Sequence, residues 1–328
     1  MSVTGRALVG ATLLAVGAAA APGCGERPAV SPVADGVTAN VAATACAGCH
    51  AAIAEEWRAS FHRTAFSDAT FQESLALEEP GERAFCTRCH APAATARRDG
   101  VAAGVDCVAC HADAHARASA SASASASGGA CGTCHEFAFD DGRADLVQKT
   151  VSEHAASTYA AVGCAECHMP ARDGHLDHRF VSGHAPAQIA RAVHVDVARE
   201  RDARGGKDGV RVAIRADAGH AFPTGDMFRR ARLLVLAEGA GGQIVADAER
   251  TFGRTWGGVA GGAHAGRREQ RSDTRIRGTW AELVELEAPS APIVRVRWML
   301  LYERVIAMRG PHVDLASSDT IAEGELIW

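Results

Sequence analysis

The chain of 328 residues has 34 lysines and arginines against 39 aspartates and glutamates, a formal net charge of −5. This length allows two domains. The acidic balance argues against nucleic acid as a partner, because phosphate backbones bind clusters of basic residues. After the N-terminal segment, no apolar run approaches the roughly 18 residues that a membrane-spanning helix requires.

The first segment, residues 1–23, is predicted to be a signal peptide. Arg6 precedes an apolar stretch at residues 7–21 that is short for a membrane span. Gly23-Cys24 resembles the end of a lipoprotein signal, so Cys24 is a candidate lipid anchor; ordinary cleavage that leaves Cys24 as a spare thiol is the alternative. Both predict an exported protein, either periplasmic or a lipoprotein of the outer membrane or cell surface. Residues 24–43 lack periodicity and are predicted to be a linker.

The pattern C-x-x-C-H occurs five times and uses ten of the 11 cysteines. The copies are Cys46-Cys49-His50, Cys86-Cys89-His90, Cys107-Cys110-His111, Cys131-Cys134-His135 and Cys164-Cys167-His168. Two cysteines three positions apart on a helical turn each reach one vinyl group of a porphyrin, and the adjacent histidine lies under the iron. The cofactor prediction is therefore five covalently attached haem c groups. The alternatives are zinc held by paired cysteines and a thioredoxin-like redox pair.

Residues 44–188 form the predicted haem domain, made mainly of helices and loops. Each haem has too few residues here to be buried separately, so we expect the haems to pack against one another. The Ala/Ser-rich stretch at 116–130 is predicted to be a flexible surface loop.

The haem domain also contains a faint internal repeat. Residues 55–66 and 152–163 both look helical, and Glu56 aligns with Glu153 and Ser60 with Ser157.

From about Ile189 the apolar pattern changes to period two, in segments such as "GVRVAIRA", "RLLVLAE" and "IVRVRWMLLY". Several short strands with this spacing predict an antiparallel β-sandwich of immunoglobulin-like kind at residues 189–328. The predicted fold class is thus α+β multidomain, with a helical and loop multihaem domain followed by this sandwich.

An iron with two axial protein ligands needs one residue beyond its motif histidine, usually histidine or methionine. His62 is the first candidate, because its predicted helix also carries Trp57 and Phe61, which can cover a porphyrin. His115 follows His111 by four residues and is a candidate for a neighbouring haem.

Two further regions supply candidates. His178 and His184 lie in "HRFVSGH", where a glycine lets the backbone approach a haem closely. His220 lies in "AGHAFPTG" between predicted strands, and either reaches over the last haem or bonds its own turn. His154 is the reserve candidate.

These segments resemble a known family. "CAGCHAAIAEEWRASFHRTAF", "CTRCHAP", "GVDCVACH", "CGTCHEF", "CAECHMP", "HRFVSGH" and "AGHAFPTG" are similar to multihaem c-type cytochromes related to the electron-accepting tetrahaem cytochrome of hydroxylamine oxidation and, more distantly, to pentahaem nitrite reductase. The likeness covers roughly residues 44–260. It implies stacked haems, mainly bis-histidine ligation and electron transfer in the periplasm or at the cell surface. It also implies that His62 matches a distal-ligand position and that His178, His184 and His220 fall in signature segments.

The chain departs from the catalytic relatives. The reductases resemble one another in a C-x-x-C-K motif that this chain lacks. Tyr159 and Tyr302, its only tyrosines, do not lie in the context of the haem cross-link of hydroxylamine oxidoreductases.

The predicted function is a pentahaem c-type cytochrome that transfers electrons between redox partners outside the cytoplasm by haem-to-haem hopping, without catalysis. The expected partners are other cytochromes, a quinol-linked membrane complex or a terminal reductase. The alternative is a multihaem oxidoreductase with one open haem that acts on a small nitrogen or sulfur compound, with Arg172, Asp173 and His175 as acid–base groups. A third possibility is a structural or adhesion protein whose β-domain carries the function.

Overall fold

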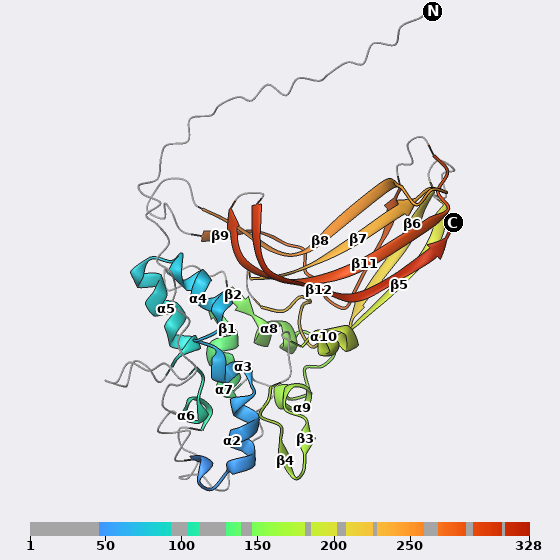
Figure 1. Ribbon diagram of the computed structural model, residues 1–328. Helices are drawn as coiled ribbons and strands as arrows, with labels where there is room; N and C mark the ends of the chain where they lie inside the picture. Colours follow the sequence, from blue (N-terminus) through green and yellow to red (C-terminus); the bar gives the residue numbers. More distant parts are fainter. Residues whose placement is uncertain are drawn as a thin grey trace, which may run out of the picture. The chain divides into compact units, whose positions relative to one another are not determined.

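The computed structural model describes residues 46–92, 104–111, 129–138, 146–180, 185–201, 208–225, 228–258, 268–286, 291–309 and 312–328 (Figure 1). The chain divides into two compact units, Met1–Pro32 and Val33–Trp328, and every described residue belongs to the second unit. The predicted signal peptide, Cys24, the linker, His115 and His184 lie outside the described residues.

Helices dominate the part of the chain that carries the haem motifs. They are α2 (Ala51–Arg58), α3 (Phe61–Thr64), α4 (Ala69–Ala76), α5 (Pro80–His90), α6 (Cys107–Cys110), α7 (Gly129–His135), α8 (Thr150–Ala155) and α9 (Cys164–His168), followed by α10 (Pro186–Ala192). Side-chain caps begin several of them, since Asp68 accepts from the Phe71 N–H at 3.0 Å and Asp106 from the Ala109 N–H at 3.2 Å.

Two small hairpins lie among these helices. One pairs β1 (Glu136–Ala138) with β2 (Leu146–Lys149), and the other pairs β3 (Ala171–Arg172) with β4 (His175–Leu176). The second turns through Asp173 and Gly174, whose φ angles of 50° and 83° suit the Asp-Gly sequence of a tight hairpin turn.

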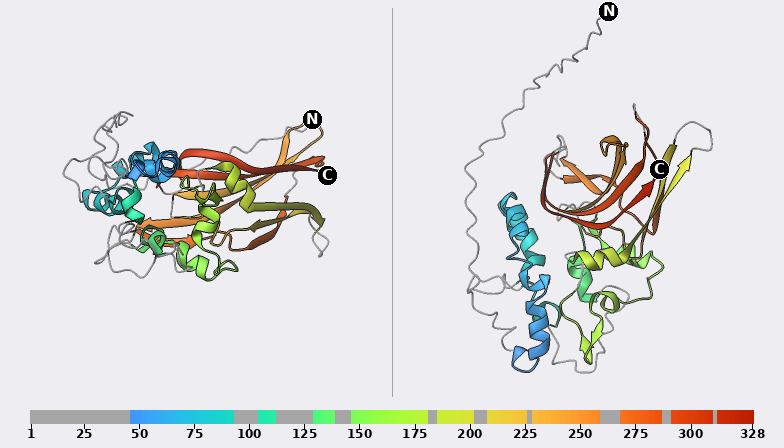
Figure 2. Two further views of the ribbon diagram at one scale, coloured as in Figure 1. Left: turned by 90° about the horizontal axis from the view of Figure 1, so that it is seen from below. Right: turned by 45° about the vertical axis from the view of Figure 1, so that its right-hand side comes forward.

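The C-terminal part consists of two antiparallel sheets (Figures 1 and 2). The three-stranded sheet has the order β10-β6-β5, with β5 (Val193–Arg201), β6 (Asp208–Ala216) and β10 (Thr279–Glu285). The five-stranded sheet has the order β12-β11-β7-β8-β9, with β7 (Arg229–Glu238), β8 (Ile244–Gly258), β9 (Arg268–Asp273), β11 (Arg295–Arg309) and β12 (His312–Ile327).

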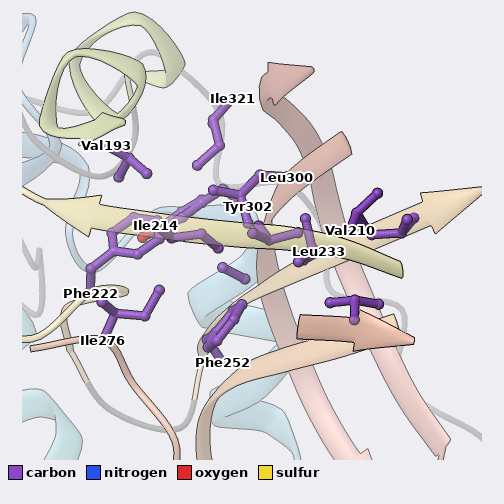
Figure 3. Packing of buried hydrophobic residues seen from close by; sticks show 14 of the residues in the cluster. Val193, Val210, Ile214, Phe222, Leu233, Phe252, Ile276, Leu300, Tyr302 and Ile321 are labelled. Carbon is purple, nitrogen blue, oxygen red and sulfur yellow. The ribbon is translucent and has the colours of Figure 1, made fainter. Parts of the chain in front are cut away.

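One apolar cluster joins the two sheets (Figure 3). Val210, Val212 and Ile214 alternate with Arg211, Ala213 and Arg215 along β6, and only the first set is fully buried. They share the cluster with Leu233 of β7 and Leu300 of β11, among others. Period-two alternation thus buries one face of each sheet against the other, as the sequence predicted. The immunoglobulin-like strand topology remains a prediction.

Some boundaries differ from the sequence predictions. The continuous helices expected at 55–66 and 152–163 are interrupted, because α2 ends at Arg58 and α8 at Ala155. Ser60 explains the first break, since its hydroxyl donates to the Trp57 carbonyl at 2.7 Å and accepts from the Arg63 N–H at 3.2 Å. Residues 129 and 130 of the predicted 116–130 loop belong to α7, while 116–128 lie outside the described residues.

Candidate multihaem site

The motif segments adopt local geometry that suits covalent attachment. In the first and third motifs the histidine N–H bonds to the carbonyl of the first cysteine, from His50 to Cys46 and from His111 to Cys107, each at 2.9 Å. The second, fourth and fifth motifs end α5, α7 and α9. One helical turn therefore places the cysteines three positions apart, and the histidine four positions after the first cysteine, on neighbouring parts of one face.

The five motifs also meet one another in space. Thiols of different motifs lie close enough to shift one another's pKa in three pairs: Cys46 and Cys107, Cys89 and Cys134, and Cys131 and Cys164. The nearby Cys134 thiol lowers the pKa of Cys89 to about 7. Burial, followed by the proximity of Cys164 and Cys110, raises the pKa of Cys131.

The fourth motif, Cys131–His135, is the junction of this arrangement. Its two cysteines interact with the second motif through Cys89, with the third through Cys110 and with the fifth through Cys164. Cofactors attached to these thiols would have their edges close together.

Three motif histidines face a histidine from outside the motifs. The ring centres are 6.4 Å apart for His135 and His62, 6.3 Å for His111 and His178, and 6.2 Å for His168 and His220. The ring planes of these pairs make angles of 61°, 32° and 18°. Three of the five predicted distal ligands, His62, His178 and His220, are thus paired with a predicted proximal ligand.

The spacing of these pairs tests which metal chemistry fits. An imidazole nitrogen lies about 2.0–2.1 Å from its metal and about 1.1 Å from its own ring centre, so two rings on opposite sides of one metal have centres about 6.3 Å apart. Two rings on a tetrahedral zinc would have centres only about 5.1 Å apart. Rotation of a ring about the metal–nitrogen axis leaves this separation unchanged. The observed distances fit axial ligation of a haem iron.

Hydrogen bonds orient several of these rings. The Nδ1–H groups of His178 and His90 donate to the carbonyls of Leu176 and Ala65 at 2.7 and 2.8 Å. For His220, Nδ1 bonds the Thr224 hydroxyl, whose own proton goes to the Ala221 carbonyl at 2.9 Å, so Nδ1 is the donor. A donor at Nδ1 leaves Nε2 with a free lone pair for a metal.

Burial keeps two of the candidate distal rings, His62 and His220, neutral. It lowers the pKa of His62 to about 4, with additional effects of His135 and His168. It lowers the pKa of His220 to about 4 as well, again with a contribution of His168. A neutral imidazole is the form that ligates iron.

Apolar packing around the motifs also fits porphyrin. The buried apolar side chains among described residues 46–180 are few, namely Ala54, Trp57, Leu75, Ala91 and Val147, whereas the large cluster lies between the sheets. The His62 ring contacts Phe180 with centres 4.3 Å apart, and the His90 ring stacks on Phe71 at 3.8 Å. Flat aromatic groups beside the ligands provide surfaces on which a porphyrin can pack.

Charged groups fix the loops near the distal histidines. Hydrogen bonds from Arg179 lower the pKa of the buried Asp177, which precedes His178, to about 2. Burial opposes ionisation of Asp273, but Arg275 and Arg277 hold its pKa well below the usual range.

Other predicted residues have structural partners. His154, the reserve ligand, packs on the His220 loop, since a Cβ added to Gly219 would lie 2.6 Å from its Cδ2. His175 and Arg172, the acid–base candidates, pair with Glu56 at 3.1 Å and Asp177 at 3.6 Å.

Within the described parts of the chain, no disulfide joins the ten motif cysteines, and no three or more His, Cys, Asp or Glu side chains cluster as metal ligands. None of the helices in those parts is both long and apolar enough to cross a membrane.

Sequence reasoning did not assign a role to Glu56 or Glu153, although it aligned them. Glu56 accepts the His178 N–H, and Glu153 accepts the N–H of Ala221, the residue after His220. The shared position in the repeat was the available signal.

Comparisons with known proteins agree with this geometry. The family described as "Cytochrome c554 and c-prime" matches residues 45–112. The fold is similar to that of a penta-heme cytochrome c552 from Thermochromatium tepidum, with a TM-score of 0.63 and 22% identity over 86% of this chain and 97% of that chain. A comparison with curated proteins found no match. Residues 45–112 are thus similar to this cytochrome family, and the chain shares the fold of that penta-heme cytochrome.

Proposed function

We propose that the chain is a pentahaem c-type cytochrome that carries electrons between redox proteins outside the cytoplasm. The observation that carries this proposal is the set of three histidine pairs with ring centres 6.2–6.4 Å apart. Each pair would hold one haem iron between two imidazoles, and a haem held in this way would supply electron transfer without binding a substrate.

The chain's own residues would hold the cofactors in a simple division of labour. The ten motif cysteines would form the thioethers, and the motif histidines would bind as proximal ligands. His62, His178 and His220 would be the distal ligands opposite His135, His111 and His168. His115 and His184 remain the proposed distal ligands of the other two haems. Bound haem c supplies an iron that alternates between the ferric and ferrous states.

The proximity of the thiols supports a branched path. Cys46 lies near Cys107, Cys110 near Cys131, and Cys131 near Cys164, so we propose that the first, third, fourth and fifth motifs are in series. The second motif joins at the fourth through Cys89 and Cys134. We therefore propose that electrons pass through the haem of the fourth motif.

The proposed partners are other cytochromes, a quinol-linked membrane complex or a terminal reductase. The proposed location is the periplasm or, with Cys24 lipidated, the outer membrane or cell surface. The proposed domain organisation is a haem domain at 44–188 and an immunoglobulin-like sandwich at 189–328.

The first test counts the cofactors. Mass spectrometry of the exported protein should show five covalent haems, and metal analysis should show five irons without zinc. Electron paramagnetic resonance should show low-spin ferric haems with distinct g-values, because the angle between axial imidazole planes differs among the three pairs. A colourless protein or one that holds zinc would refute the proposal.

The second test concerns the path. The double substitution Cys131→Ala and Cys134→Ala removes the fourth attachment site, and Cys86→Ala with Cys89→Ala is the matched control that removes the side branch. After substoichiometric reduction and rapid freezing, the signals of the His111 and His168 haems should equilibrate in the wild type and the control. They should fail to equilibrate in the fourth-motif variant; unchanged equilibration there would contradict the branched path.

A further inference from the structure

We propose that Glu56 and Glu153 are matched positioning residues, each of which holds the backbone beside a distal histidine and thereby keeps one haem six-coordinate. This inference rests on the proposed ligation by His178 and His220. Its evidence is a set of hydrogen bonds that the two glutamates repeat in different parts of the chain.

Glu56 of α2 holds the loop that carries His178. One carboxylate oxygen accepts the His178 N–H at 3.0 Å, and His175 Nε2 lies 3.1 Å from both oxygens. The glutamate side chain is 16% exposed. The loop is therefore fixed at the residue whose ring faces His111.

Glu153 of α8 holds the loop that carries His220. One oxygen accepts the Ala221 N–H at 3.1 Å, and the other accepts from Arg275 Nη2 at 2.5 Å. Arg275 is 1% exposed and is also bound by Asp273. The carboxylate itself is held in place, so it can act as a fixed point for the residue that follows His220.

The two helices share more than the glutamate. Four residues after each glutamate a serine donates to the carbonyl three positions back, from Ser60 to Trp57 at 2.7 Å and from Ser157 to His154 at 2.8 Å. The faint sequence repeat is thus a repeat of hydrogen-bonding pattern. In both copies the carboxylate reaches a backbone N–H on a segment distant in sequence, 122 and 68 residues away.

The chemistry explains why a carboxylate serves at these positions. A bond from a backbone N–H to an ionised carboxylate is stronger than one between neutral groups. An axial ligand on a loop needs such support, because a small displacement of the ring is enough to lose the metal bond.

The test uses the exported, haem-loaded protein with Glu56→Ala and Glu153→Ala, and Glu55→Ala as the control. Glu55 neighbours Glu56 on the same helix but is 77% exposed. Each of the first two variants should convert one low-spin signal to high spin, that of the His111 haem or that of the His168 haem, and the ferrous protein should bind up to one more equivalent of carbon monoxide. The control should match the wild type.

Two further substitutions separate positioning from general support of the fold. Glu→Gln retains an acceptor but loses the charge, so its spectrum and carbon monoxide binding should lie between those of the wild type and the Ala variant. Glu→Asp retains the charge but shortens the reach, and should give the Ala phenotype in weaker form; it replaces the Ala variant if that does not accumulate. Wild-type spectra in the Ala and Asp variants would overturn the proposal. Loss of the low-spin signals of all haems, rather than of one, would also overturn it.

The variants His178→Ala and His220→Ala distinguish the two levels of inference. Each should open one haem to carbon monoxide. If neither histidine variant binds more carbon monoxide, the proposed ligation by His178 and His220 is wrong, and so is the positioning role of the glutamates. If the histidine variants bind more carbon monoxide and the glutamate variants do not, only the positioning role is wrong.

Discussion

Replacement of Gly104 by alanine should displace the segment that carries His62 and destabilise the protein. Gly104 has a φ of +70°, and a Cβ added there would lie 2.3 Å from the His62 carbonyl oxygen and 2.4 Å from that of Arg63. The next residue, Val105, donates its N–H to the same His62 carbonyl at 2.8 Å. The atoms that the new Cβ would meet belong to the backbone of His62 and Arg63, so no side-chain rearrangement can relieve the clash.

The magnitude follows from two contributions. A side chain in the left-handed region costs about 1–2 kcal/mol. Separation of the two segments loses the bond from Val105 to His62, about 0.5–1.5 kcal/mol, and strains the 2.9 Å bond from Trp57 Nε1 to the Val105 carbonyl. We expect a total loss of about 2–4 kcal/mol in the free energy of unfolding.

Urea titration followed by the haem Soret band measures this loss. With a slope of about 3 kcal/mol per molar urea, the midpoint should fall by about 1 M. Gly81→Ala is the control, because a Cβ there meets nothing within 4 Å and its position in α5 favours alanine. An unchanged midpoint and an unchanged signal of the His135 haem in Gly104→Ala would refute the reasoning.

Three further outcomes are expected. Glu303→Ala should lower the free energy of unfolding, measured by urea titration, by about 3–5 kcal/mol, because the carboxylate is 0% exposed and pairs with two arginines. The control Glu249→Ala removes a side chain that is 45% exposed and should lower it by at most about 1 kcal/mol. Equal losses in the two variants would contradict this prediction. Because His220 stays neutral in the folded protein while an unfolded histidine titrates near about 6.5, the unfolded chain binds more protons below that pH, so stability should fall as the pH drops below about 6.5, and less steeply in His220→Gln. Gly219→Ala should push the His220 loop off His154 and increase carbon monoxide binding, and the added change His154→Ala should reverse this; no rescue would exclude that contact as the cause.

Local patterns predicted much of the fold. The motif helices, and strands such as β6 and β7, follow from the spacing of residues a few positions apart. In these strands the residues that recur with period two are also the ones that are buried. The strands β8, β9 and β12 were not predicted. In β12 most residues are half-buried or exposed at the edge of the sheet, so its sequence "HVDLASSDTIAEGELI" shows little alternation of apolar and polar residues.

The candidate site was predictable as a set of residue types, and for His220 as one of two alternatives, a position over the last haem or a bond within its own turn. The sequence did not decide between these alternatives, because the approach of His220 to His168 depends on how the β-sheet part packs against α8 and α9. The roles of Glu56 and Glu153 were hidden for the same reason, since each bonds a backbone group far along the chain. The sequence repeat marked the two glutamates, and the hydrogen-bond distances indicate their role.

The part of the chain with the two sheets also builds the site. His220 and Arg275 both come from it, and Arg275 is buried where it bonds Glu153 of α8. A buried ion pair adds little net stability over apolar packing, because both charges lose their hydration. We therefore infer that this ion pair serves to position groups of the site. Arg275 fixes Glu153, and Glu153 fixes the backbone after His220, so the His220 ring stays opposite His168. By this argument the sheets would hold one side of the haem proposed at the fifth motif, and they also form a core of their own.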